Sequence, residues 1–375
     1  MTKKLAIVVN KANFFLSHRI NIALSAQKEG YQVHLISDGM PDDISKITHK
    51  GIIFHQISFT RTYKNIFVEM RTIIELFLKY KKIKPYIIHH VTIKPIVYGN
   101  IVCKLINQKR IVNSISGLGY IFVNKNIRNK ILKFFVLKLY KLFFNSESVR
   151  VILQNEEEKD FLLKNKVSNE RSLRLVPGAG VNTSLFRPPD SFKNKNIIVF
   201  AARMIKEKGV EDLVNAVEKL HSMNYDLKLI LLGGVDRDYP THIKKTTLEK
   251  WNKKTFIDWY GHTDNVVSFY QIASIVCMPS YYSEGVPKSL IEAAAVGKPI
   301  ITTDMPGCRS IVINEFNGLL VKPRNINELT NSIKYLLDNP NICSEFGKNG
   351  RTHALRTFDE KKIIDLTLSV YKEIG

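Results

Sequence analysis

Cysteine is scarce in this sequence. Only Cys103, Cys277, Cys308 and Cys343 occur among 375 residues, and they are scattered along the chain. No Cys-x-x-Cys pair and no cluster of cysteine with histidine is present, so neither a structural zinc site nor a disulfide framework is indicated. This usage favours a reducing compartment, and we expect a cytoplasmic protein.

Long apolar runs are also missing. The first run, LAIVVN at residues 5–10, has five apolar residues before Asn10 and Lys11. It is shorter than the apolar core of a signal peptide. No stretch approaches the ~18 apolar residues of a membrane-spanning helix. We therefore expect no transmembrane segment.

Acidic residues are outnumbered by basic ones. The chain has 56 Lys and Arg against 34 Asp and Glu, which leaves a formal net charge of +22. Such an excess implies an anionic partner, either nucleic acid or an anionic membrane surface. Aromatic residues are not interleaved with basic ones as on an RNA-binding platform, and no nucleic-acid motif is present. We expect a membrane surface and no nucleic acid.

One segment concentrates this charge. In NKNIRNKILKFFVLKLYKLFFNS, residues 124–146, Lys130, Lys133, Lys138 and Lys141 fall within about 140° of one another on a helix, and apolar residues fill the rest. A basic amphipathic helix is typical of a membrane-surface element. A core-packed helix with a solvated lysine stripe is the equally weighted alternative.

The order of the elements predicts two α/β domains. In the first half, apolar strands are expected at LAIVVN, VHLIS, YIIHHV, RIVNSI and VRVILQ, with helices between them. The turn-rich segment 174–192 marks a boundary. After it the alternation restarts with NIIVFAAR, LKLILLGG, TFIDWYG, SIVCMPS and PIITTD.

We therefore expect an α/β fold of two Rossmann-like domains facing across a cleft. The first would span residues 1–185 and the second would span residues 186–357. Residues 358–375 are expected to form a C-terminal helix that packs at the junction and crosses back. Small-molecule sites are common in clefts between domains.

The segment SEGVPKSLIEAAAVGKP, residues 283–299, holds Glu284 and Glu292. Pro287 suits a first helical turn, so the pattern predicts a helix over about 287–296. Eight helical steps separate the two backbone positions by on the order of 12 Å, whereas glycosidase carboxyl groups lie about 5–9.5 Å apart. The spacing suits the two ends of one extended ligand, with a helix N-terminus between them that favours a phosphate. A surface helix with two solvated carboxylates is the alternative.

Two cations follow a strand in VFAARMIKEKGVEDL. Arg203 and Lys208 lie where a strand ends and a helix begins. Open α/β sheets bind ligands at the carboxyl ends of their strands, and a guanidinium with an ammonium suits a diphosphate. Two solvated loop cations are the alternative.

These segments together resemble a known family. AARMIKEKGVEDLVNAV, LKLILLGG and the run from WYGHTDNVV to FNGLLV, within residues 197 to 321, are similar to the donor-binding half of the retaining nucleotide-sugar glycosyltransferases of family 4, which have the GT-B architecture. FFLSHRINIALSAQKEGYQVHLIS, HHVTIKPIVYGN, SISGLGYIF and VILQNEEEKDFL resemble the subset that builds bacterial O-antigen and capsule repeat units on a polyprenyl-diphosphate carrier.

The resemblance implies that the first domain, residues 1–185, binds the acceptor and that the second, residues 186–357, binds the nucleotide sugar. It also implies a role for each motif residue. Arg203 and Lys208 would grip the donor diphosphate, Glu284 would face the donor sugar, and Glu292 would accept hydrogen bonds from the ribose hydroxyls. Electrostatic stabilisation of the leaving diphosphate would carry most of the catalysis, so Glu284, Arg203 and Lys208 are the expected catalytic residues. The remaining donor-binding positions are Gly285, Val286 and Pro287.

The acceptor side departs from the family pattern. NKANFFLSHR replaces the glycine-rich turn that many members place after the first strand, and residues 116–118 replace a histidine. His18 is the first acceptor-side candidate, because SHR is expected to begin a helix facing the cleft. The other candidates are Ser116, Lys94, His89 and His90.

An acidic pair offers a competing interpretation. In LKLILLGGVDRD, Asp236 and Asp238 imitate the DxD motif that holds Mn²⁺ or Mg²⁺ in the other large glycosyltransferase fold. The pair lies downstream of Arg203 and Lys208, which already supply positive charge. We therefore expect no metal and no other cofactor.

The sequence thus predicts a retaining hexosyltransferase of lipopolysaccharide O-antigen or capsule biosynthesis. It would move an N-acetylhexosamine or hexose, with N-acetylgalactosamine favoured, from a UDP-sugar to a polyprenyl-diphosphate-linked glycan. We expect a peripheral protein on the cytoplasmic face of the bacterial inner membrane. The alternatives are a soluble transferase with a non-lipid acceptor and a noncatalytic protein that binds an anionic ligand.

Overall fold

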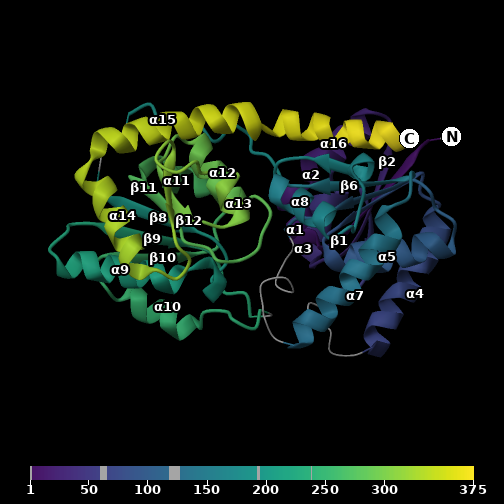
Figure 1. The fold of residues 1–375 in the computed structure, drawn as a ribbon, viewed down its shortest axis with the longest axis horizontal. Helices are drawn as coiled ribbons and strands as arrows, with labels where there is room; N and C mark the ends of the chain where they lie inside the picture. Colours follow the sequence, from purple (N-terminus) through teal and green to yellow (C-terminus); the bar gives the residue numbers. More distant parts are fainter. Residues whose placement is uncertain (1, 60–65, 118–126, 192–194, 238) are drawn as a thin grey trace. The chain divides into compact units, whose positions relative to one another are not determined.

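The structure is a computed structural model that describes residues 2–59, 66–117, 127–191, 195–237 and 239–375. The chain forms two compact units (Figure 1). The first comprises residues 1–179 and 361–375, and the second comprises residues 180–360. The division falls at residues 179 and 180, and the last helix returns to the first unit.

A seven-stranded parallel sheet forms the centre of the first unit. Its strands lie in the order β3 (Ile53–Gln56), β2 (Gln32–Asp38), β1 (Lys4–Lys11), β4 (Ile87–Val91), β5 (Ile111–Ser114), β6 (Val149–Leu153) and β7 (Leu173–Leu175). The order reverses between β1 and β4, so the carboxyl ends of these two neighbours flank a topological switch point.

Helices cover both faces of this sheet. They are α1 (Ala12–His18), α2 (Ile20–Lys28), α3 (Pro41–Thr48), α4 (Ile66–Ile83), α5 (Ile93–Leu105), α7 (Ile127–Phe144), α8 (Glu156–Lys164) and α16 (Glu360–Ile374), with the short turn η1 (Glu170–Ser172). Side chains alternate along β1, so Ala6 and Val8 join a core with α4, α5 and α7, whereas Leu5, Ile7 and Val9 join a core with α1, α2, α3 and α16. The C-terminal helix is therefore part of the first unit's core.

The second unit contains a six-stranded parallel sheet. Its strands lie in the order β10 (Ile257–Gly261), β9 (Lys228–Leu232), β8 (Ile197–Ala201), β11 (Ile275–Met278), β12 (Ile300–Thr303) and β13 (Gly318–Val321). The order reverses between β8 and β11, which pair directly. This pair defines the switch point of the second unit.

The helices of the second unit are η2 (Lys206–Lys208), α9 (Val210–Ser222), α10 (Lys245–Asn252), α11 (Val266–Ile272), α12 (Lys288–Ala295), α13 (Pro306–Arg309), α14 (Ile326–Asp338) and α15 (Pro340–Thr357). Helix α12 packs against β11 and β12, and α15 packs on α12. Arg351 of α15 donates to the carbonyl of Ala295 at the end of α12. This contact fixes the helix that carries Glu292.

The sequence-based prediction of an α/β fold with two Rossmann-like units is confirmed. The strands expected from apolar runs all form, and the helix expected at 287–296 forms as Lys288–Ala295 with Pro287 at its N-cap. One expectation about α1 and α2 is wrong. His18 does not begin a helix: it ends α1, because ANFFLSH is itself helical and the chain turns at Arg19 before α2. Among the described residues, no helix is long and apolar enough to cross a membrane.

Candidate functional site

The carboxyl ends of β8 and β11 bring the predicted donor residues together. Arg203 lies two residues after the end of β8, and Lys208 ends the turn η2 that comes next. The loop after β11 carries Glu284 and leads into α12. Because β8 and β11 are neighbours in the sheet, residues that are 76 positions apart in the sequence meet at one edge.

Lys208 and Glu284 form the closest contact of this site. The Lys208 Nζ lies 2.6 Å from each carboxylate oxygen of Glu284, and both side chains are largely buried. Ser280 Oγ also donates to Glu284 Oε1, at 3.1 Å. A buried lysine that contacts both carboxylate oxygens holds the carboxylate in one orientation.

Two glycines allow the loops around this pair to approach. Gly209, at φ +75°, would place a side-chain Cβ 2.1 Å from the carbonyl oxygen of Pro279. A Cβ at Gly307 would lie 1.6 Å from the carbonyl oxygen of Gly285. Any larger residue would push the loops apart, so these glycines determine where Lys208 and Gly285 lie.

Arg203 has a carboxylate partner of its own. Its Nη1 donates to Asp236 Oδ2 at 2.9 Å, and its guanidinium lies over the ring of Tyr239, 5.2 Å from the centroid. Burial is the largest single influence and lowers the pKa of Arg203, but the hydrogen bond with Asp236 and the electrostatic effects of Asp236, Tyr282 and Tyr239 together outweigh it, so the net shift is upward. Arg203 therefore stays charged at any physiological pH.

Tyr282 lies between the two cationic groups. Its ring is 5.9 Å from Lys208 Nζ and 6.4 Å from the ring of Tyr239, which in turn contacts Arg203. Burial raises the pKa of Tyr282, so its hydroxyl stays neutral. The carboxyl ends of β8 and β11 therefore carry two cations, Arg203 and Lys208, with aromatic side chains between them. This arrangement suits the charge and the width of a diphosphate.

Asp236, one of the two residues of the possible metal-binding DxD motif, is an ion-pair partner of Arg203. Its DxD companion Asp238 lies outside the described residues. Within the part of the chain that the structure describes, no group of three or more His, Cys, Asp or Glu side chains could hold a metal ion.

Glu292 lies on α12, behind the loop that carries Glu284. Its carboxylate is 13% exposed and its Oε1 lies 3.5 Å from Lys288 Nζ, one helical turn away. Burial raises the pKa of Glu292, and Lys288 partly opposes this shift. A largely buried carboxylate whose partner lies 3.5 Å away keeps acceptor capacity for a ligand's hydroxyl groups.

Each predicted acceptor-side residue has contacts within the first unit. His18 stacks on Phe14 with ring centroids 4.3 Å apart, and its Nδ1 lies 2.6 Å from Ser17 Oγ. Ser116 follows β5 and accepts from Arg19 Nη2 at 3.4 Å. Lys94 is buried in an ion pair with Glu69, at 2.7 Å.

His89 and His90, the other two candidate histidines, are fully buried in β4. His89 lies between Ser114 Oγ at 2.6 Å and Tyr371 OH at 2.7 Å. His90 contacts Asn113 and Tyr80. Burial lowers the pKa of both rings, to about 4 for His90, so both are neutral. They join β4 to its neighbours.

Two family models match the chain and together span most of it. The model described as "Glycosyl transferases group 1" matches residues 182–353, which include Arg203, Lys208 and Glu284. The model described as "Glycosyl transferase 4-like" matches residues 4–155. The chain belongs to the group 1 glycosyltransferases. The family is retaining, so this glycosyltransferase transfers sugar with retained anomeric configuration.

Individual proteins similar to this glycosyltransferase support the family. One is the N,N'-diacetylbacillosaminyl-diphospho-undecaprenol alpha-1,3-N-acetylgalactosaminyltransferase of Campylobacter jejuni, 28% identical over 273 residues, which cover 69% of each chain. A glycosyltransferase structure from Rickettsia africae matches with a TM-score of 0.78 and 22% identity, over 100% of this chain and 98% of that one. HepE of Anabaena, solved with UDP and glucose, matches with a TM-score of 0.79 and 15% identity, over 99% of each chain. The last two show the shared GT-B fold.

Sequence reasoning missed several members of the site. Ser280, Tyr282 and Tyr239 contact the donor residues, and none was singled out. Position in the chain could have indicated two of them, because Ser280 and Tyr282 lie in the loop that leads from β11 to Glu284. Arg19 was also missed, although it stands beside the candidate His18.

Proposed function

We propose that this glycosyltransferase moves a sugar from a UDP-sugar to a saccharide linked to polyprenyl diphosphate. The observation that carries the proposal is the meeting of Lys208 and Glu284 at the β8–β11 switch point, with Arg203 beside them. In this position Lys208 can bind the diphosphate of a nucleotide sugar while Glu284 binds the sugar of the same molecule.

Each donor residue takes one part of the ligand in this proposal. Arg203 and Lys208 hold the diphosphate and stabilise its charge as the bond to the sugar breaks. Glu284 accepts hydrogen bonds from the sugar, and Glu292 accepts them from the ribose. The amides of Gly285 and its neighbours, before α12, contact the phosphates.

The acceptor follows from the relative in Campylobacter jejuni. Its name specifies a diphospho-undecaprenol acceptor and an N-acetylgalactosaminyl group. We extend both to this protein, with N-acetylgalactosamine as the favoured sugar and an N-acetylhexosamine or hexose as the class. His18, Ser116 and Lys94 remain the acceptor-side candidates, and the repeat unit of an O-antigen or capsule is the proposed product.

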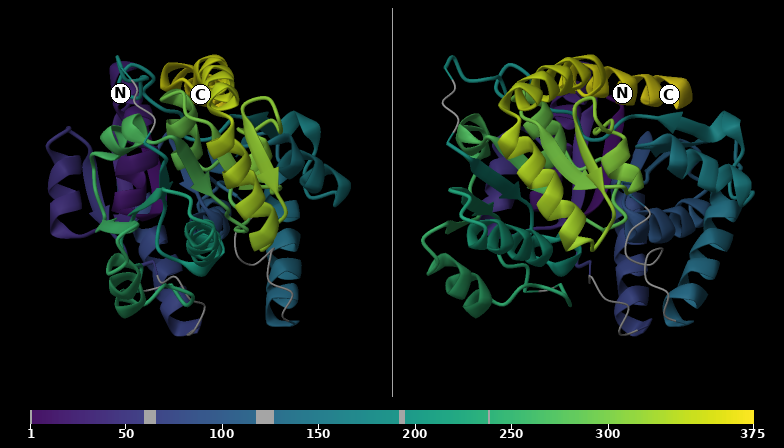
Figure 2. Two further views of the ribbon diagram at one scale, coloured as in Figure 1. Left: turned by 90° about the vertical axis from the view of Figure 1, so that its left-hand side faces the viewer. Right: turned by 60° about the vertical axis from the view of Figure 1, so that its left-hand side comes forward.

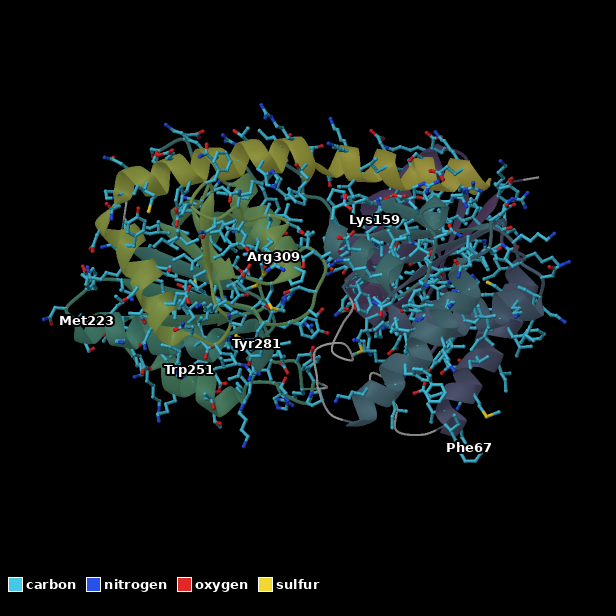
Figure 3. All side chains as sticks on the ribbon, viewed as in Figure 1. Phe67, Lys159, Met223, Trp251, Tyr281 and Arg309 are labelled. Carbon is cyan, nitrogen blue, oxygen red and sulfur yellow. The ribbon has the colours of Figure 1, made fainter. Side chains whose placement is uncertain are left out.

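A lipid-linked acceptor requires that the protein reach a membrane, and two helices suit that task. Side chains of α4 and α7 are exposed although they are large and apolar, among them Phe67 at 77%, Phe134 at 53% and Phe135 at 57%. Figure 2 shows both helices projecting beyond the sheet of their unit on the same side, and Figure 3 shows Phe67 at the outer end of α4.

Lysines accompany these apolar side chains. Lys138 lies 4.5 Å from the centroid of the Phe134 ring, and Lys130 and Lys141 are exposed on the same helix. The opposite face of α7 packs in the core through Val136 and Tyr140. The two alternatives for this segment therefore describe different faces of one helix. We propose that the exposed face docks on anionic lipid at the cytoplasmic face of the inner membrane.

A transfer assay tests the proposed function. Purified protein receives a panel of UDP-sugars with either a synthetic polyprenyl-diphosphate monosaccharide or a free sugar as acceptor, and mass spectrometry follows the products. We expect one UDP-sugar to extend the lipid-linked acceptor. Transfer to free sugars alone would favour a soluble transferase, and nucleotide binding without any transfer would favour a noncatalytic binding protein.

A further inference from the structure

A buried arginine in the first unit has no anionic partner among the described residues. Arg19 is 4% exposed and joins α1 to α2. Its Nη2 donates to Ser116 Oγ at 3.4 Å, and its Nε is buried without any acceptor.

The two titratable neighbours of Arg19 do not supply a negative charge. Burial raises the pKa of Tyr371, so its phenol stays protonated. Burial lowers the pKa of His89, and the nearby Arg19 charge lowers it further, so that ring is neutral. Arg19 remains a cation, since burial lowers its own pKa only to about 10. An unpaired buried charge is strongly unfavourable, which indicates that a ligand supplies the missing anion.

Arg19 lies at the edge of the sheet where a ligand is expected. Ser116, its partner, follows the carboxyl end of β5. Adjacent strands end in further polar side chains with buried, unpartnered atoms. These atoms are Asn10 Oδ1 near the end of β1, Thr92 Oγ1 after β4 and Asn155 Nδ2 after β6.

The four strand ends are neighbours in the order β1, β4, β5 and β6, with the switch point between β1 and β4. Buried polar atoms normally have partners, so three unpartnered atoms at the same edge of the sheet as the partner of Arg19 indicate a binding site. The Thr92 hydroxyl and the Asn155 amide can donate to phosphate oxygens, whereas Asn10 Oδ1 can accept from a sugar hydroxyl.

The backbone at Thr92 adds to this site. Thr92 has φ +75°, a conformation that a β-branched residue rarely adopts, and its side chain does not cap α5. Helix α5 therefore begins with uncapped N–H groups at the carboxyl end of β4. Such an N-terminus favours a phosphate.

We propose that Arg19 binds the diphosphate of the acceptor, with Thr92, Ser116, Asn155 and the start of α5 around it. The inference deepens the proposed function and rests on it, since it names the residues that recognise the acceptor's diphosphate. Asn10 contacts the saccharide that the diphosphate carries. The donor and acceptor diphosphates thus have separate cations, each at the switch point of its own sheet.

A thermal-shift titration tests this site directly. The protein is first saturated with UDP, so that the donor residues of the second unit are occupied. Geranyl diphosphate, inorganic pyrophosphate or inorganic phosphate is then added, and the melting temperature gives the affinity of each probe. We expect geranyl diphosphate to stabilise the wild type, with inorganic phosphate bound at least about tenfold more weakly.

The variant Arg19→Met separates ligand binding from a structural role. Removing an unpaired buried charge should leave the ligand-free melting temperature equal or higher. The shift caused by geranyl diphosphate should fall by about tenfold or more in apparent affinity. Arg19→Lys should bind with intermediate affinity, since it keeps the charge without the forked guanidinium. Arg171→Gln is the matched control on an exposed arginine of the same unit and should behave as wild type.

Several results would overturn the inference. Arg19→Met with an undiminished geranyl diphosphate shift would remove Arg19 from the site, and so would an Arg19→Met protein that is less stable yet still binds. Equal affinity for inorganic phosphate would identify a free-phosphate site instead. Transfer assays distinguish this failure from that of the proposed function: no transfer by the wild type to any acceptor contradicts the function, whereas undiminished transfer by Arg19→Met contradicts the Arg19 site alone.

Discussion

Lys208 contacts both carboxylate oxygens of Glu284, at 2.6 Å each, although the two residues come from different strand ends. Without a ligand, the charge of this lysine is therefore directed at Glu284. A diphosphate that binds Lys208 must share this lysine with the Glu284 carboxylate, which is negatively charged like the diphosphate. The pair links donor binding to the orientation of the residue proposed to contact the sugar.

Substituting Glu284 tests this link. Glu284→Gln removes the charge that repels a diphosphate, so UDP should bind as tightly as in the wild type or a few-fold more tightly. Transfer should fall by about 10²-fold or more, because Lys208 and the sugar lose their shared partner. Calorimetry measures the affinity for UDP, and initial rates measure the transfer. The exposed Glu345→Gln is the control, and a Glu284→Gln enzyme with normal turnover would contradict the assignment.

Glu292 gives a prediction about pH. Burial raises the pKa of its carboxyl group in the folded protein, so the folded state binds this proton more readily than the unfolded chain. Ionisation therefore reduces stability above the folded pKa, and the penalty disappears as pH falls toward the unfolded value of about 4.3. Glu292→Gln should melt higher than the wild type at pH 8, and the difference should shrink as the pH is lowered.

The same variant should bind UDP about tenfold more weakly if Glu292 accepts hydrogen bonds from the ribose. Melting curves from pH 8 to pH 5 and UDP titrations measure the two effects independently. A Glu292→Gln protein with lower stability at pH 8, or with unchanged UDP affinity, would show that the carboxylate has a different role.

Metal independence is the third prediction. Arg203 and Lys208 supply the positive charge for a diphosphate, so activity should survive EDTA, and added Mn²⁺ should not raise it. Asp236→Asn should weaken UDP binding only a few-fold, because it loosens Arg203. Asp190→Asn, which breaks the exposed pair with Arg187, is the control. Loss of activity in EDTA with recovery in Mn²⁺ would favour the DxD interpretation.

Membrane docking is the fourth prediction. Replacing Phe134 and Phe135 with glutamate should lower binding to phosphatidylglycerol vesicles by roughly tenfold or more, since both apolar area and favourable charge are lost. High salt should also weaken the binding. Flotation assays measure both. Met223→Glu, at a similarly exposed apolar position of the second unit, is the control, and equal flotation of the double variant would exclude this face.

The strands that sequence reasoning found share a physical reason. Central parallel strands are buried on both faces, so β1, β4 and β8 are continuous apolar runs that a sequence displays directly. The missed strands do not show this signal. β3 and β13 lie at the edges of their sheets, β3 is partly exposed, and β7 has three residues. Helix α1 was missed because its seven residues contain no strong start or stop signal.

The site was predictable in its residues but not in its contacts. Motif spacing and the family resemblance singled out Arg203, Lys208, Glu284 and Glu292 as candidates, and their roles stay a prediction. The pairing of Lys208 with Glu284 and of Arg203 with Asp236 depends on which strands are neighbours, and a single sequence does not contain that information. The burial of Arg19 likewise depends on the fold and cannot be read from a single sequence.

The most direct measurement for the whole account is the NMR spectrum of the product made from UDP-N-acetylgalactosamine and a synthetic polyprenyl-diphosphate monosaccharide. The account predicts one added residue on the lipid-linked sugar, with the small anomeric coupling of an α linkage, as in the donor. If no tested UDP-sugar extends this acceptor, or if the product has the large coupling of a β linkage, the account is contradicted.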